Sequence, residues 1–205
     1  MLLPRLALLI AFGTLAVGLT FAADCGETTR RISIDLWSTK SLSSPNRQWL
    51  FTSVGPNSAQ RVARLYIENR RTHQKWEVGS IERDGTVFWS EDGRRVFLRD
   101  EYAADDTKIR LFDVTGQAPS EVTGLDDRVR QAVFHYIPPN ETTLWLYYPE
   151  VCFAATNSST ILLTADAPRV PVAGSGSGKR LAVKLAVDVV SLRVKVTVLS
   201  VHIER

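Results

Sequence analysis

The feature that most constrains the fold of this chain is an internal repeat. The segment that begins at Ser44 aligns with the one that begins at Ser90, an offset of 90 − 44 = 46 residues. The matching segments are 44–51 with 90–97, 64–66 with 110–112, and 87–88 with 133–134. Each unit contains an apolar pair, a polar turn and an apolar run. Repeats of this length are typical of supersecondary units that bury their apolar faces against neighbouring copies.

The units have the composition of β-strands. Residues 96–98, 109–114 and 144–148 are rich in aromatic and β-branched side chains and are bounded by turn formers. The short apolar run Val133-Phe134-His135-Tyr136 is interpreted as a further strand. Gly93 lies in a tight-turn sequence, because glycine readily adopts the positive φ that hairpin turns require.

The C-terminal part alternates between apolar and polar residues. Over residues 181–199 the apolar residues recur at every second position, interrupted near Val190-Ser191. This period predicts a C-terminal hairpin with one buried face. Outside the leader, almost no segment has helical periodicity, and the sequence therefore predicts a single all-β domain over residues 23–205.

One unit resembles a known family. Residues 87–114 contain the turn Trp89-Ser90-Glu91-Asp92-Gly93, followed by two strand-like runs. This segment resembles one blade of a TolB-type or WD-like β-propeller, in which the turn is usually Trp-Ser-Pro-Asp-Gly; here Glu91 replaces the proline. Weaker copies lie around residues 41–67 and 133–163. The resemblance implies four-stranded antiparallel blades and, in relatives, protein- or peptide-binding roles outside the cytoplasm.

The number of blades leaves three architectures open. A closed propeller typically has four to eight blades, and 205 − 22 = 183 residues at 46 residues each allow about four. The sequence contains three recognisable units. The alternatives are a four-bladed ring, an open set of blades that closes by oligomerisation, and a β-sandwich whose hairpins resemble blades.

Residues 1–22 have the composition of a secretory signal peptide. Arg5 precedes an apolar run over residues 6–21, and Thr20 and Ala22 supply the small residues for cleavage after Ala22. The run is shorter than the roughly 20 residues of a membrane-spanning helix. We therefore expect a secreted or periplasmic protein, bound to a membrane only if the leader is not removed.

The two cysteines fit an oxidising compartment. Cys25 and Cys152 are the only cysteines in the chain, and export favours a disulfide between them. The alternative is two free or intermolecular thiols.

A glycine-rich segment imitates two catalytic motifs. Residues 173–180 resemble a phosphate-binding loop, but Arg180 stands where a Ser or Thr binds Mg²⁺, and a strand pattern follows in place of a helix. The same missing helix excludes a nucleophile elbow at residues 174–178. Residues 172–180 are therefore interpreted as a Gly/Ser connector, and no nucleotide is expected.

The sequence lacks the residue patterns of nucleic-acid, metal and calcium sites. The net charge is +3, and acidic and basic residues are interspersed, which argues against nucleic-acid binding. His73, His135 and His202 are isolated from metal-ligand partners. Acidic pairs occur at 100–101, 105–106 and 126–127 without a calcium-loop pattern. We expect no metal, no cofactor and no catalytic residue.

The sequence favours an exported, non-catalytic β domain that binds a protein or peptide, or serves as a scaffold. The expected partner is another exported or envelope protein. One alternative is a small secreted hydrolase that uses turn carboxylates such as Asp105 and Asp106. The other is an adhesive or envelope-structural subunit whose C-terminal hairpin pairs with another chain's sheet edge.

Overall fold

The computed structural model describes residues 31–56, 61–102, 106–143, 145–154, 157–171 and 179–204. These residues form fourteen strands and one helix, which confirms the all-β class. The elements are β1 (Arg31–Ile34), β2 (Lys40–Ser43), β3 (Trp49–Val54), β4 (Ala63–Asn69), β5 (Gln74–Ile81), β6 (Gly85–Trp89), β7 (Arg95–Asp100), β8 (Lys108–Asp113), β9 (Ser120–Glu121), α1 (Leu125–Phe134), β10 (Glu141–Thr142), β11 (Tyr147–Ala154), β12 (Asn157–Pro171), β13 (Lys179–Val190) and β14 (Arg193–Glu204).

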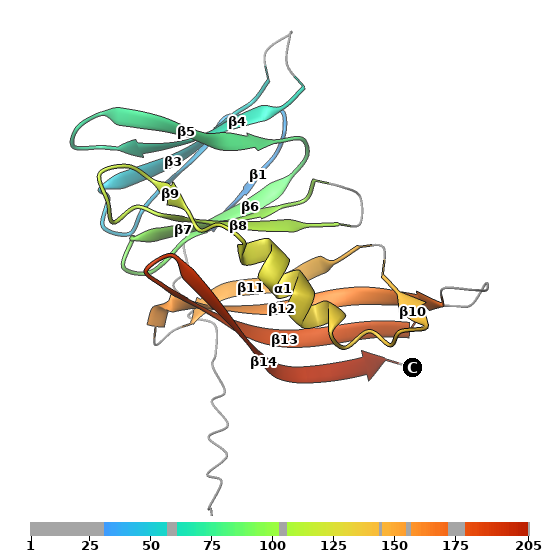
Figure 1. Ribbon diagram of the computed structural model, residues 1–205. Helices are drawn as coiled ribbons and strands as arrows, with labels where there is room; N and C mark the ends of the chain where they lie inside the picture. Colours follow the sequence, from blue (N-terminus) through green and yellow to red (C-terminus); the bar gives the residue numbers. More distant parts are fainter. Residues whose placement is uncertain are drawn as a thin grey trace, which may run out of the picture.

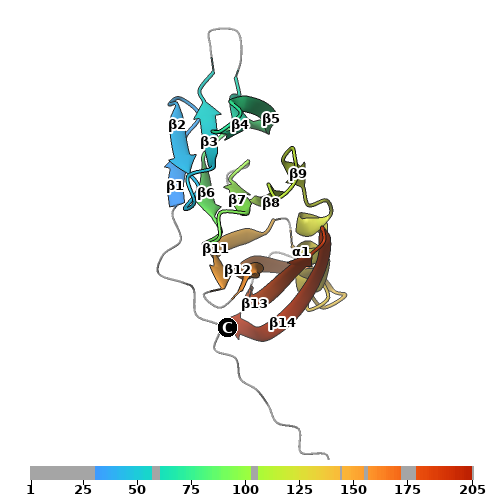
Figure 2. The ribbon, with the colours of Figure 1, turned by 90° about the vertical axis from the view of Figure 1, so that its left-hand side faces the viewer.

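The strands form three antiparallel sheets that are stacked in series (Figures 1 and 2). The N-terminal sheet has the order β2-β3-β4-β5, and the central sheet has the order β1-β6-β7-β8-β9. The C-terminal sheet has the order β11-β12-β13-β14, with β10 paired to β12. Within the described residues, each outer sheet shares a core with the central sheet and not with the other outer sheet. This open stack is compatible with blade-like packing and with a sandwich.

The central sheet is buried on both faces. Its strands contain continuous apolar runs, because alternate side chains point into two different cores. The side chains toward the N-terminal sheet are Val87, Trp89, Val96, Leu98 and Phe112. Those toward the C-terminal sheet are Phe88, Phe97, Ile109 and Leu111. Phe88 stacks on Phe97 at 4.8 Å between ring centroids and meets Phe153 of β11 edge-on at 5.6 Å.

Residues 181–199, which alternate in sequence, lie in the hairpin of β13 and β14. The five apolar residues of β13 from Leu181 to Val189 are fully buried, in the core shared with the central sheet. The chain reverses at Ser191 and Leu192, whose φ angles are 50° and 63°. Positive φ at both central residues is what a two-residue type I′ turn requires.

The expectation of a strand at residues 133–136 is wrong. Val133 and Phe134 are the last residues of helix α1, and His135 caps it. The reason lies upstream: Leu125, Val129 and Val133 recur at four-residue spacing and form a buried helical stripe. The third sheet consequently begins after the helix, with the short strand β10 and then β11 from residue 147.

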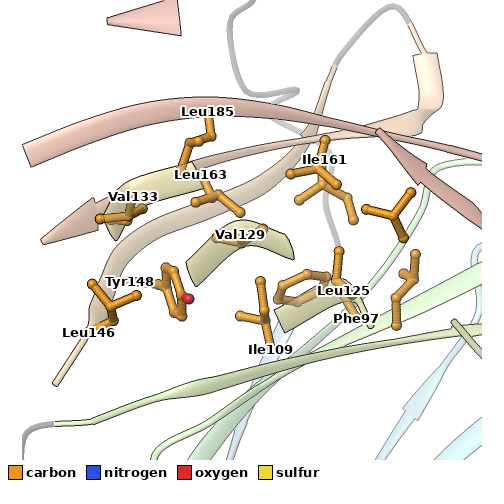
Figure 3. Packing of buried hydrophobic residues seen from close by; sticks show 14 of the residues in the cluster. Phe97, Ile109, Leu125, Val129, Val133, Leu146, Tyr148, Ile161, Leu163 and Leu185 are labelled. Carbon is orange, nitrogen blue, oxygen red and sulfur yellow. The ribbon is translucent and has the colours of Figure 1, made fainter. Parts of the chain in front are cut away.

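Helix α1 fills the space between the central and C-terminal sheets. Figure 3 shows its apolar stripe facing Phe97 and Ile109 on one side and Leu163 and Leu185 on the other. The helix therefore keeps these two sheets apart at one edge while sharing their core. No helix in the described part of the chain is long and apolar enough to span a membrane.

Candidate functional site

The turn between β6 and β7 is built around one serine. The Ser90 hydroxyl donates to Asp92 Oδ1 at 2.7 Å and accepts the Arg95 N–H at 2.9 Å. Asp92 Oδ1 also accepts the Arg94 N–H at 3.0 Å. Gly93 has a φ of 67°, a left-handed conformation that glycine adopts without steric cost.

The turn between β2 and β3 repeats this network 46 residues earlier. The Ser44 hydroxyl donates to Asn46 Oδ1 at 2.7 Å and accepts the Trp49 N–H at 3.0 Å. Asn46 Oδ1 accepts the Gln48 N–H at 3.1 Å. Arg47 stands at the position of the glycine and has a φ of 57°. The spacing found in the sequence therefore has a physical basis in two equivalent turns.

These two turns lie against each other and join the N-terminal and central sheets. Asn46 Nδ2 donates to the Asp92 carbonyl at 3.2 Å. A Cβ atom on Gly93 would lie 2.7 Å from the same Asn46 nitrogen, which leaves no room for a side chain. Trp89 is fully buried, and its indole N–H donates to the Leu42 carbonyl of β2 at 3.0 Å. The ends of the two sheets are thus fixed relative to each other.

A polar cleft of about 630 Å³ opens beside the paired turns. We call it the turn cleft. It is formed where the hairpin ends of the N-terminal sheet meet those of the central sheet. Its lining residues are Asn46, Gln48, Trp49, Asn69, Arg71, Asp92, Gly93, Arg94, Val114, Thr115 and Gly116.

Two arginines dominate the charge of the turn cleft. Arg71 comes from the turn between β4 and β5, and Arg94 from the turn between β6 and β7. Both are exposed, and neither has an ion-pair partner within the described residues. The one acidic lining residue, Asp92, already accepts two hydrogen bonds inside its own turn. The cleft is therefore suited to carboxylate and carbonyl ligands, which guanidinium groups bind with paired hydrogen bonds.

An aromatic pair supports the wall of the turn cleft. Trp49 is buried and lies 6.0 Å from Trp76 between ring centroids. The indole of Trp49 and the side chain of Val114 give the mainly polar cleft its apolar surface. Large aromatic side chains beside arginine are the composition typical of protein-binding hot spots.

Sequence reasoning found only part of this cleft. The predicted turn residues Asp92 and Gly93 line it, whereas Ser90 and Trp89 are buried next to it. Arg71 and Thr115 were missed, because they come from turns that no motif marks. The available signal was the repeat itself, since equivalent turns of adjacent units are expected at the same end of adjacent sheets.

A second polar cluster lies beneath helix α1. Arg130 donates to Asp126 Oδ2 at 2.6 Å and to Asp106 Oδ1 at 2.9 Å. Asp106 also accepts the Tyr102 hydroxyl at 2.6 Å and the Leu146 N–H at 3.0 Å. We call this group the α1 clamp, because it ties the helix to the segments that precede β8 and β11.

The carboxylates of the α1 clamp differ in pKa. Burial raises the pKa of Asp126 above its ordinary value, although Arg130 opposes this. Burial acts in the same direction on Asp106, but hydrogen bonds from Tyr102 and Leu146 and the charge of Arg130 outweigh it and lower the pKa. The hydrogen bonds of Asp106 to Tyr102, Arg130 and Leu146 hold this carboxylate within the fold. Asp105, its partner in the hydrolase alternative, lies outside the described residues.

Asp100 is a buried carboxylate of the central sheet. It is 7% exposed, and its Oδ1 has no hydrogen-bond partner in the part of the chain that the structure describes. Burial raises its pKa to about 6, against the opposing charges of Arg110 and Lys108. The neighbouring Glu101 pairs with Arg99 at 2.9 Å.

The other sequence candidates do not gather into a site. Cys152 lies buried in β11; Cys25, Ala22 and the glycine-rich residues 172–178 lie outside the described residues, so the disulfide and the cleavage remain predictions. The three histidines lie in the turn after β4, at the end of α1 and in β14. Over the described ranges, no three metal-ligating side chains cluster.

No protein-family model matches the chain, and no curated protein is detectably similar to it in sequence. The function must therefore be inferred from the chemistry of the turn cleft and its surroundings.

Proposed function

We propose that this protein is an exported, non-catalytic β domain that binds a protein or peptide partner in the turn cleft. The partner is another exported or envelope protein that presents an acidic, extended segment. The observation that carries the proposal is a polar cleft with two arginines, Arg71 and Arg94, that have no ion-pair partner within the described residues.

The rigidity of the turn cleft supports a binding role. Its floor is held by the serine-centred turns and by the Asn46 bond to the Asp92 carbonyl. A site whose walls are fixed before binding loses little conformational entropy when the ligand arrives.

The charge of the cleft supports an acidic partner. A carboxylate placed between Arg71 and Arg94 could accept hydrogen bonds from guanidinium groups on two different sheets. Trp49 would contact the apolar part of the same segment. The resemblance to TolB-type blades, whose relatives bind proteins or peptides, points in the same direction.

The test is crosslinking in the cell from inside the cleft. A photo-crosslinking amino acid at Gln48, an exposed lining residue, is expected to capture a defined partner. The double variant Arg71→Glu/Arg94→Glu is expected to reduce capture by about tenfold or more, because like charges repel an acidic segment.

The matched control changes the same net charge elsewhere. Arg83 and Arg128 are exposed and do not line the turn cleft; Arg83→Glu/Arg128→Glu should leave capture at Gln48 unchanged. Equal losses in both double variants would show a general charge effect, and the proposal would fail. Capture of no partner at Gln48 would also contradict it.

A further inference from the structure

We propose that two copies of this chain pair through β14, antiparallel and about a two-fold axis, so that their C-terminal sheets become one continuous sheet. Within the described residues β14 pairs with β13 alone, so its other edge is open. Leu199, Val201 and Ile203 on this strand are 48%, 36% and 48% exposed. A twelve-residue edge strand with exposed apolar side chains is a template for pairing with another strand.

A β-bulge at Leu199 changes which residues of β14 face the core and so limits the registers in which the strand can pair with a copy of itself. Val198 lies opposite Leu185, whereas Ser200 lies opposite Lys184, so Leu199 is the extra residue. Before the bulge the even-numbered valines of β14 face the core. After it the odd-numbered Val201 and Ile203 are on the core face, because they pair with buried residues of β13.

This change of phase allows antiparallel self-pairing in registers whose residue numbers sum to an odd value, and the sum of 397 is the one that pairs the whole of β14. Directly opposed residues of antiparallel strands lie on the same face. Pairs whose numbers sum to 193 + 204 = 397 satisfy this rule on both sides of the bulge. The pairs between the two copies are Arg193 with Glu204, Val194 with Ile203, Lys195 with His202, Val196 with Val201, Thr197 with Ser200, and Val198 with Leu199.

The chemistry of this register is complementary except where the basic Lys195 lies opposite His202. The basic Arg193 meets the acidic Glu204 at each end, and the apolar residues meet apolar residues on the core face. Hydroxyl-bearing Thr197 and Ser200 meet on the outer face. Opposite charges and apolar partners at directly opposed positions each stabilise a strand pair. Because both copies use the same residues, the contact closes as a dimer and leaves no further edge of this kind.

A cleft beside α1 receives the partner's apolar end. It has a volume of about 500 Å³, and its apolar lining residues are Ala132 of α1 and Val194 and Val196 of β14, with Arg128, Gln131, His135 and Lys195 around them. In the proposed register, Ile203 of the second copy lies opposite Val194 and its Val201 opposite Val196. The exposed apolar half of one β14 thus covers the cleft beside the other. Figure 1 shows the helix lying over this sheet, with β14 at its edge.

The first test is the mass of the purified protein in solution. Sedimentation equilibrium is expected to show a concentration-dependent dimer, weakened by about tenfold or more by Val201→Lys, because a charge on the core face of the pair is costly to bury. Val190→Lys is the control, since Val190 is 64% exposed and lies outside β14. Thermal unfolding of both variants reports whether they fold. A wild-type monomer at all concentrations, or equal weakening by both variants, would overturn the proposal.

The second test examines the register. Arg193→Glu should weaken the dimer, and combining it with Glu204→Arg should restore it. Mixed samples of Lys195→Cys and His202→Cys should form an intermolecular disulfide that neither variant forms alone. Failure of the charge exchange to restore pairing, or crosslinking of either variant alone, would contradict this register. These tests do not involve the turn cleft, so they can fail while the proposed binding function stands.

Discussion

At the scale of single residues, Gly93 and Gly124 illustrate two physical reasons why a position requires glycine: backbone conformation and lack of space for a Cβ atom. Both have positive φ, 67° and 73°, but only Gly93 has a neighbour, Asn46, where a Cβ atom would lie. Gly124→Ala is therefore expected to cost about 1 kcal/mol of unfolding free energy, the cost of the left-handed backbone alone. Gly93→Ala should cost at least about 2 kcal/mol, because Asn46 must also move and lose its hydrogen bonds. Denaturant unfolding measures both values.

The extra cost at Gly93 can be traced to its source. In an Asn46→Ala background, a Cβ atom on residue 93 meets no amide nitrogen, so the added cost of Gly93→Ala should fall to that of Gly124→Ala. An unchanged cost in this background would show that the contact between the two turns contributes nothing to stability.

Asp100 lowers the stability of the fold as the pH rises, whereas most carboxylates of folded proteins raise it. Its pKa in the folded protein is about 6, above the ordinary 3.8. Between about pH 4 and pH 6 the folded state therefore binds more protons than the unfolded chain, and the free energy of unfolding falls as the pH rises. Above this range the full cost of the buried charge is present, and below it the cost is absent.

Asp100→Asn removes this titration while keeping the shape of the side chain. The variant should match the wild type near pH 4 and be more stable at pH 7, by about 1 kcal/mol once solvent screening is allowed for. Denaturant unfolding across this range gives the difference. Parallel stability curves for the two proteins would show that Asp100 titrates as an ordinary carboxyl group.

At the scale of elements, the α1 clamp holds the helix between two sheets. Arg130 bonds Asp106, Asp126 and the Thr107 carbonyl. Arg130→Met leaves two poorly solvated carboxylates without a counter-charge, and we expect a loss of about 2 to 4 kcal/mol.

Arg128→Met is the matched control for the clamp, because Arg128 is exposed on the same helix and should tolerate the change. Adding Asp126→Asn to Arg130→Met should recover part of the lost stability, since it removes one uncompensated charge. Equal effects of Arg128→Met and Arg130→Met would contradict the role of the clamp.

The same scale shows what could be predicted from the sequence. The strand runs at residues 96–98 and 109–114 are correct because their apolar side chains serve two cores, which leaves few other conformations for them. Helix α1 was missed because its apolar residues are few: the buried stripe of Leu125, Val129 and Val133, and the exposed Phe134. Four apolar residues among six polar or small ones are a weak signal in a chain otherwise dominated by strands. The turn cleft could not be predicted from the sequence for another reason, because its residues come from turns that are far apart in the chain.

At the scale of the whole molecule, the stack has one protected layer and two exposed ends. The central sheet is covered on both faces, whereas β14 is an open edge of the last sheet among the residues that the structure describes. Amide hydrogens exchange through openings whose free energy rises with the buried contacts that must break. The slowest amides should therefore lie in β6, β7 and β8, and their rates should not depend on protein concentration.

The amides of β14 should behave differently if two copies pair through that edge. Dilution would free the outward N–H groups of β14, and their exchange should accelerate while that of the central sheet stays constant. Val201→Lys should give the fast rates at every concentration, and Val190→Lys should behave as the wild type. Hydrogen–deuterium exchange with mass spectrometry at several concentrations resolves the two regions in one experiment. If the exchange rates of the β14 amides do not depend on protein concentration, the open edge remains unpaired.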